Sequence, residues 1–107
     1  MNHKKTKSCE IKIFIAGDIV QIKQVVRMYC QETGFCVTVT PTSYIYTGGE
    51  EEGVIIGVIN YPRFPQEPLS LFIRAYRLGK RIMRKCNQKS FTVAGPKQTW
   101  WFYSDNK

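Results

Sequence analysis

The residues of this 107-residue chain best suited to chemistry are the arginines and lysines of one stretch, Pro68 to Lys89. At about 100° per residue, this stretch places six cations on one arc of a helix and apolar side chains on the opposite arc. No acidic residue lies between Leu69 and Lys89. Like charges four residues apart on a helix repel one another, and a partner outside the monomer would relieve that repulsion. The six cations are Arg74, Arg77, Lys80, Arg81, Arg84 and Lys85.

A dense cationic face of this kind is suited to an anionic macromolecule, either a nucleic acid or the acidic face of a host nucleoprotein. Binding that neutralises about six phosphates loses roughly a thousandfold in affinity between 50 and 200 mM salt. Four consecutive aromatic residues end the chain's last strand, and they cannot all face one core. We therefore add Trp100 and Trp101 to the predicted partner surface. The alternative is an ordinary solvated face, since lysine and arginine are good helix formers.

A second candidate site combines two tyrosines with an arginine. Tyr44 and Tyr46 lie two residues apart and therefore point to the same side of a strand. With Arg63 they predict a cleft between two copies of the chain that takes a small ligand such as a nucleotide. A homodimeric small-ligand binding protein is therefore the alternative function.

The sequence predicts no catalytic residue, no metal ligand and no cofactor. Its one histidine, His3, lies near the N-terminus, so a Ser/His/Asp constellation cannot be assembled. The four cysteines form no Cys-x-x-Cys pair, and the chain has neither a P-loop nor a Gly-x-Gly-x-x-Gly motif. The prediction is therefore a non-enzymatic binding protein.

A short motif favours the opposite interpretation. The run Ile13-Phe14-Ile15-Ala16-Gly17-Asp18, echoed by Thr92-Val93-Ala94-Gly95-Pro96, resembles the strand-to-helix opening of nucleoside deoxyribosyltransferase-like proteins. The resemblance implies a nucleoside- or nucleotide-processing enzyme. It covers about a dozen residues and brings no identifiable nucleophilic carboxylate with it.

Periodicity predicts the elements that must position these residues. Alternation over Glu10–Ala16 is typical of a half-buried strand, and Asp18 and Gly34 suit the two ends of a helix over about Asp18 to Thr33. Pro41 cannot donate to a strand ladder, so its strand lies at a sheet edge or is bulged. A loop is predicted over 48–53. The remaining elements are strands at 35–40, 44–46, 54–60, 90–94 and 99–103, and a helix at about Glu67 to Asn87.

The order strand-helix-strand-strand-helix-strand, with one strand added at the C-terminus, predicts an α+β fold. It matches the ferredoxin-like βαββαβ sandwich, with two helices on one face of a mostly antiparallel sheet. The predicted domain covers residues 9–107, after a flexible basic N-terminal arm over residues 1–8. The uninterrupted apolar run Val54–Ile59 and the terminal aromatics need cover, so we expect a homodimer.

Composition and charge indicate a cellular compartment and a general class of protein that the chain resembles. The net charge is +8, and the acids gather at Glu50, Glu51 and Glu52. No apolar run is long enough to span a membrane, and the cysteine pattern predicts reduced thiols in a cytoplasm. In size and charge the chain resembles the small basic accessory proteins that bacteriophages carry for host takeover or for blocking defence. That resemblance implies an inhibitor acting in the bacterial host cytoplasm.

Overall fold

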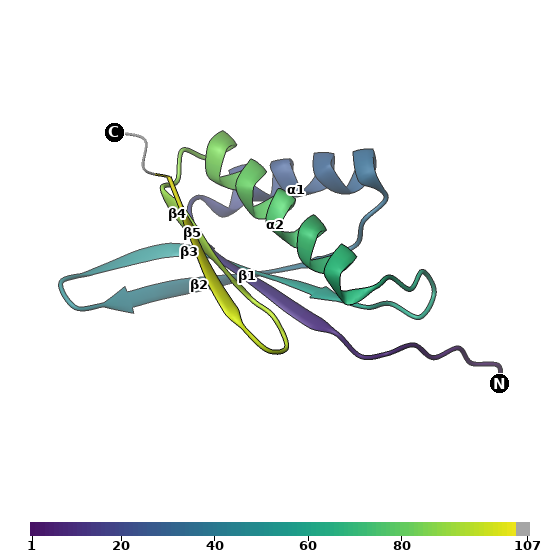
Figure 1. Ribbon diagram of the computed structural model, residues 1–107. Coiled ribbons are helices and arrows are strands. Elements are labelled where there is room, and N and C mark those ends of the chain that lie inside the picture. Colours follow the sequence, from purple (N-terminus) through teal and green to yellow (C-terminus); the bar gives the residue numbers. More distant parts are fainter. Residues whose placement is uncertain (105–107) are drawn as a thin grey trace.

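A computed structural model describes residues 1–104; the predicted domain runs to Lys107, and its last three residues lie outside that range. Five antiparallel strands form one sheet in the order β2-β3-β1-β4-β5, and both helices cover the same face (Figure 1). The predicted ferredoxin-like sandwich with an additional C-terminal strand is confirmed. The elements are β1 (Glu10–Ala16), α1 (Ile19–Thr33), β2 (Thr38–Tyr46), β3 (Gly49–Ile59), α2 (Pro68–Lys85), β4 (Ser90–Ala94) and β5 (Thr99–Tyr103).

Capping residues set both ends of helix α1. The Asp18 carboxylate accepts a hydrogen bond from the Gln21 backbone N–H at 3.0 Å, which satisfies one of the first free donors of the helix. Gly34 ends the helix in the left-handed conformation, with φ 69° and ψ 52°. Both ends agree with the sequence prediction.

The core lies between the sheet and the two helices. Alternate residues of β1 and β3 point into it, and α2 contributes Leu71, Ala75, Leu78 and Ile82, as the helical periodicity predicts. Leu69 belongs to the apolar arc that the periodicity predicts, but it is an exception, because its side chain is 68% exposed and lines surface pockets instead. Neither helix in the described part of the chain has the length and apolar character needed to cross a membrane.

The hairpin of β2 and β3 is longer than predicted. The turn is only Thr47 and Gly48, whose φ of 92° glycine adopts without strain, and β3 begins at once with Gly49. Pairing of β1 with β3 stops at Gly53, and residues 43–52 pair as strands only with each other and project beyond the sheet (Figure 1). One further backbone hydrogen bond, from the Gly17 N–H to the Glu52 carbonyl at 2.9 Å, ties their base to the end of β1. We call residues 43–52 the hairpin arm. The three glutamates predicted for a loop tip therefore lie in a strand of this arm.

The sheet face away from the helices is covered by no element among residues 1–104 (Figure 1). We call it the open face. Phe14 and Ile55 are half-buried on it, while Ile59 and Trp101 are exposed. Pro41 lies in the edge strand β2, as predicted.

The N-terminal segment is joined to the domain through Asn60, the one buried polar residue of the described chain. Its Nδ2 donates to the Lys7 carbonyl at 2.9 Å and to the Thr6 hydroxyl at 3.3 Å, while its Oδ1 accepts from the Gln66 N–H at 2.9 Å. The end of the predicted N-terminal arm is thus tied to the connection between β3 and α2.

Candidate functional site

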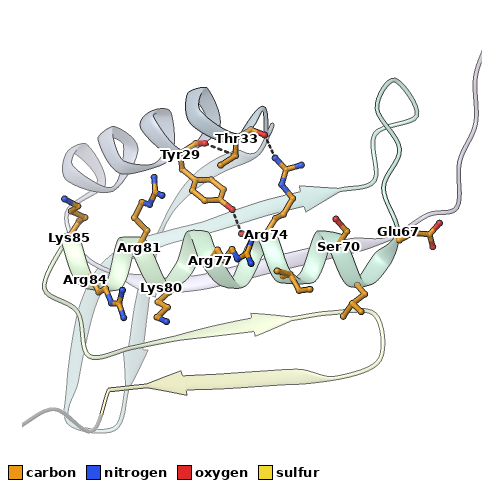
Figure 2. Close-up of a pocket in the computed structure, with 12 residues that line it drawn as sticks. Tyr29, Thr33, Glu67, Ser70, Arg74, Arg77, Lys80, Arg81, Arg84 and Lys85 are labelled. Atoms are coloured by element: carbon orange, nitrogen blue, oxygen red, sulfur yellow. Dashed lines mark hydrogen bonds between the residues drawn. The ribbon is translucent and has the colours of Figure 1, made fainter.

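The predicted cations of α2 line a groove between the two helices. Figure 2 shows them along α2, with Tyr29 and Thr33 of α1 opposite. The groove encloses about 1110 Å³ and also contains the exposed apolar side chains of Leu69 and Ile73. We call it the cationic groove. Its lining is Tyr29, Thr33, Glu67, Leu69, Ser70, Ile73, Arg74, Arg77, Lys80, Arg81, Arg84 and Lys85.

Two of these cations join the helices to each other. Arg74 donates from Nη2 to the Thr33 carbonyl at 2.5 Å, and its guanidinium lies 4.4 Å from the centre of the Phe35 ring. Arg81 forms an ion pair with Glu32 at 2.7 Å. The charge repulsion along α2 is therefore relieved in part within the monomer, by a glutamate of α1 that the sequence of α2 alone cannot show.

The other predicted partner residues are not all on one surface. Arg77 and Arg84 are exposed and have no ion-pair partner within residues 1–104. Trp101 lies on the open face, while Trp100 alternates to the helix side, where its ring centre is 6.2 Å from that of Phe72. The two tryptophans therefore cannot share one contact surface with the cations of the groove.

The predicted ligand cleft is not assembled within one chain. Tyr44 and Tyr46 share the open-face side of β2, as their spacing predicts. Arg63, however, lies in the connection that follows β3, whereas Tyr44 pairs with Glu51 near the start of β3. Eight residues of strand separate the two positions, which is about 26 Å.

A pocket of about 430 Å³ instead lies on the open face beside Tyr44, where β1 ends and β4 begins. We call it the Tyr44 pocket. Its side chains come from the end of β1, from the two strands of the hairpin arm, and from residues 87–92, which lead from α2 into β4. The lining residues are Phe14, Ile15, Ala16, Tyr44, Glu51, Asn87, Gln88, Lys89, Ser90, Phe91 and Thr92.

Tyr44 is held in place on both sides. Its hydroxyl donates to the Val54 carbonyl at 2.5 Å, and its ring lies against Gly53, where an added Cβ would come within 2.8 Å of the ring. Burial raises the pKa of the Tyr44 hydroxyl, and a backbone hydrogen bond to Ile15 partly opposes that shift. At neutral pH the side chain is therefore uncharged, and its hydroxyl proton is already donated to the Val54 carbonyl.

The polar side of the Tyr44 pocket is built by the end of α2. Asn87 takes the left-handed conformation with φ 56°, and the Gln88 N–H donates to the Met83 carbonyl at 2.8 Å. This is a Schellman-type helix end with asparagine in the glycine position. It turns the chain into β4, so that the Ser90 and Thr92 side chains line the pocket.

The composition of the Tyr44 pocket defines what it can bind. Aromatic rings attract flat bases and cations, hydroxyl and amide groups suit a sugar, and the Glu51 carboxylate favours a positive charge. The sequence analysis missed this cluster because sheet order, not sequence spacing, assembles it. Two signals were present: the same-side spacing of Tyr44 and Tyr46, and the run over residues 13–18 that resembles nucleoside deoxyribosyltransferase-like proteins. Residues 14–16 of that run line the pocket.

Comparison with known proteins supports the fold in detail. No protein-family model matches the chain, and no curated protein sequence matches it. Two solved structures do, and both are of a phage SAM lyase. The structure without ligand has a TM-score of 0.75 at 16% identity, covering 92% of this chain and 91% of that one. The structure in complex with S-methyl-5′-thioadenosine has a TM-score of 0.72 at 15% identity, covering 100% and 98%.

This comparison corrects the predicted function. The chain shares its fold, over almost its whole length, with an enzyme that acts on a small molecule. The prediction of a non-enzymatic nucleic-acid or nucleoprotein binder, and of a phage inhibitor of bacterial defence, is wrong in the light of that finding. The cationic face of α2 is visible in the sequence, whereas the Tyr44 pocket is assembled only in the folded sheet.

Proposed function

We propose that this chain binds S-adenosylmethionine (SAM) in the Tyr44 pocket and cleaves it to S-methyl-5′-thioadenosine. The fold shared with a phage SAM lyase supports the reaction class. The observation that carries the proposal is the Tyr44 pocket itself, where an aromatic ring, a carboxylate and hydroxyl groups meet on one sheet face.

Charge distinguishes the Tyr44 pocket from the cationic groove and from a third pocket. SAM carries a sulfonium, an ammonium and a carboxylate, so its net charge is positive. The cationic groove has six cations and one carboxylate, Glu67, and repels such a ligand. A third pocket, of about 560 Å³ beside Trp100 and Phe72, is lined by Lys97 and by no carboxylate. In the Tyr44 pocket Glu51 balances Lys89.

The product fixes the bond that breaks. S-methyl-5′-thioadenosine retains the methyl and adenosyl groups of SAM on sulfur, so the cleaved bond joins sulfur to Cγ of the amino-acid part. Its electron pair stays on sulfur, which becomes a neutral thioether. A lyase adds no water, so the bond that Cγ loses to sulfur is replaced by a new bond formed within the substrate. Either the substrate carboxylate attacks Cγ and closes a ring, or Cβ loses a proton and a double bond forms.

The residues of the pocket have distinct tasks in this scheme. The Tyr44 and Phe14 rings hold the adenine, and Glu51 attracts the cationic end of the substrate. Ring closure needs no proton acceptor and only a folded substrate, which positioning by the pocket supplies. Elimination needs a base, and Glu51 is the carboxylate that lines the pocket. Proton NMR of the second product separates the two routes, because only elimination yields vinyl protons.

A cytoplasmic location in a bacterial host belongs to the same proposal. The cysteines of the chain are free thiols, and those of Cys9 and Cys86 are buried, which suits a reducing compartment.

Titration with S-methyl-5′-thioadenosine tests the location of the site. In two-dimensional NMR we expect saturable shifts at Phe14, Tyr44 and Thr92, with Ile59 at the far end of the open face as the internal control. Shifts confined to Trp100 and Phe72 would move the site to the third pocket. No shift anywhere at millimolar ligand would contradict the proposal.

A further inference from the structure

The hairpin arm presents two carboxylates that the Tyr44 pocket does not use. Successive side chains of a strand point to opposite faces, so Glu50 and Glu52 lie on the side of the arm opposite to Glu51. Glu51 lines the Tyr44 pocket on the open face. Glu50 and Glu52 are exposed on the helix side of the sheet.

An apolar residue lies beside these carboxylates, on the neighbouring strand and on the same side of the arm. Ile45 pairs with Glu50 and is 76% exposed, while Ser43 pairs with Glu52 and donates its hydroxyl to that carboxylate at 2.9 Å. The arm pairs with no other strand over residues 43–52. A two-stranded ribbon alone is marginally stable in water, so an arm with an exposed isoleucine favours a covering surface.

The cationic groove has the complementary composition. Leu69 and Ile73 line it and are 68% and 38% exposed. The unpaired Arg77 and Arg84 follow on the same helix (Figure 2). From Leu69 to Arg84 the helix runs about 22 Å. The four residues of one strand of the arm span about 13 Å, so the groove is long enough to hold it.

We propose that the hairpin arm of a second copy of this chain lies in the cationic groove. Ile45 then contacts the apolar side chains of Leu69 and Ile73, and the two glutamates face the unpaired arginines. Because each chain has both an arm and a groove, two copies exchange arms about a two-fold axis and form a dimer. The contact is independent of the proposed reaction, since the arm uses the glutamates that face away from the Tyr44 pocket.

Light scattering on the full chain tests this contact. At 50 mM salt and tens of micromolar protein we expect twice the 12.4 kDa of the monomer, falling toward 12.4 kDa in about 0.5 M salt as the charges are screened. Glu50→Lys with Glu52→Lys, or Arg77→Glu with Arg84→Glu, should each give the monomer mass. A wild-type monomer at low salt would overturn the proposal.

Mixing makes the test independent of folding defects. The arm variant retains a native groove and the groove variant a native arm, so an equimolar mixture should recover the dimer mass. Lys23→Glu with Arg27→Glu changes the charge equally on the exposed side of α1 and should leave the dimer intact. Variants that remain dimeric, a mixture that stays monomeric, or equal dissociation by the α1 control would each contradict arm exchange. So would a wild type that gains mass only on adding a DNA oligonucleotide.

Discussion

Tyr44 shows how one residue joins local packing to the proposed chemistry. Its ring needs the space left by Gly53, where a Cβ would lie 2.4 Å from the Ile15 carbonyl, and its hydroxyl is anchored on Val54. The spacing of Tyr44 and Tyr46 predicted a shared face correctly, because strand alternation is local. It could not predict that Phe14 and Thr92 would line the same pocket, since that depends on β1 lying between β3 and β4.

The raised pKa of Tyr44 predicts a pH dependence of stability. The unfolded tyrosine titrates near pH 10 and the folded one above it, so the stabilisation is complete below about pH 10 and is lost as pH rises through the folded pKa. Tyr44→Phe should therefore lose less stability than wild type between pH 8 and about pH 11 in urea unfolding. Burial also raises the pKa of Cys9 and Cys86, but both proteins share those thiols, so their contribution cancels. Parallel pH curves for the two proteins would contradict this account.

In helix α2 the sequence predicts the buried residues well but does not predict the contacts that its cations make. Its apolar arc predicted the buried residues, because 3.6-residue periodicity is set within the helix itself. The ion pair of Arg81 with Glu32 depends on how α1 packs, and no periodicity contains that information. The hairpin arm was shortened in the prediction for a similar reason. Three glutamates among three glycines over 48–53 resemble a loop, yet pairing with Ser43 to Tyr46 extends residues 49–52 as strand.

The arginines of α2 should separate into two classes by stability. Arg74→Gln with Arg81→Gln removes a carbonyl hydrogen bond, two ring contacts and the ion pair with Glu32, and should cost about 1–2 kcal/mol. Arg77→Gln with Arg84→Gln is the matched control, with the same chemical change at unpaired positions. It should leave the free energy of unfolding of the monomer within about 0.5 kcal/mol in 0.5 M salt. Equal losses for both pairs would show that the first pair does not join the helices.

Gly79 predicts a close approach between α2 and β4. Alanine is the better helix former by about 1 kcal/mol, but a Cβ here would lie 2.5 Å from Cε2 of Phe91 in the core. Gly79→Ala should therefore destabilise the protein by about 1–3 kcal/mol in chemical unfolding. Ser70→Ala, on the exposed side of the same helix, is the control and should be neutral or stabilising. A gain in stability for Gly79→Ala would mean that α2 lies farther from the sheet.

For the whole molecule, the separation of charge decides which site suits which ligand. The net charge of +8 is concentrated on the helix layer and the N-terminal segment, whereas three of the eight acidic residues lie together on β3. A cationic substrate is therefore drawn to the end of the sheet that holds the Tyr44 pocket and repelled by the groove. The sequence predicted the basic patch on α2 and the acidic patch at Glu50 to Glu52. It did not predict that successive glutamates of β3 point to opposite faces of the sheet.

The most direct test of the proposed function is release of S-methyl-5′-thioadenosine from SAM, followed by chromatography and mass spectrometry. We expect the wild-type chain to form it well above the spontaneous rate and Glu51→Gln to lose at least tenfold in kcat/KM. Glu10→Gln makes the same chemical change on the same sheet face, near the opposite end of β1 from the pocket, and should retain wild-type activity. A folded wild-type chain that releases no S-methyl-5′-thioadenosine, or equal activity in Glu51→Gln and Glu10→Gln, would contradict the assignment of the Tyr44 pocket as the active site.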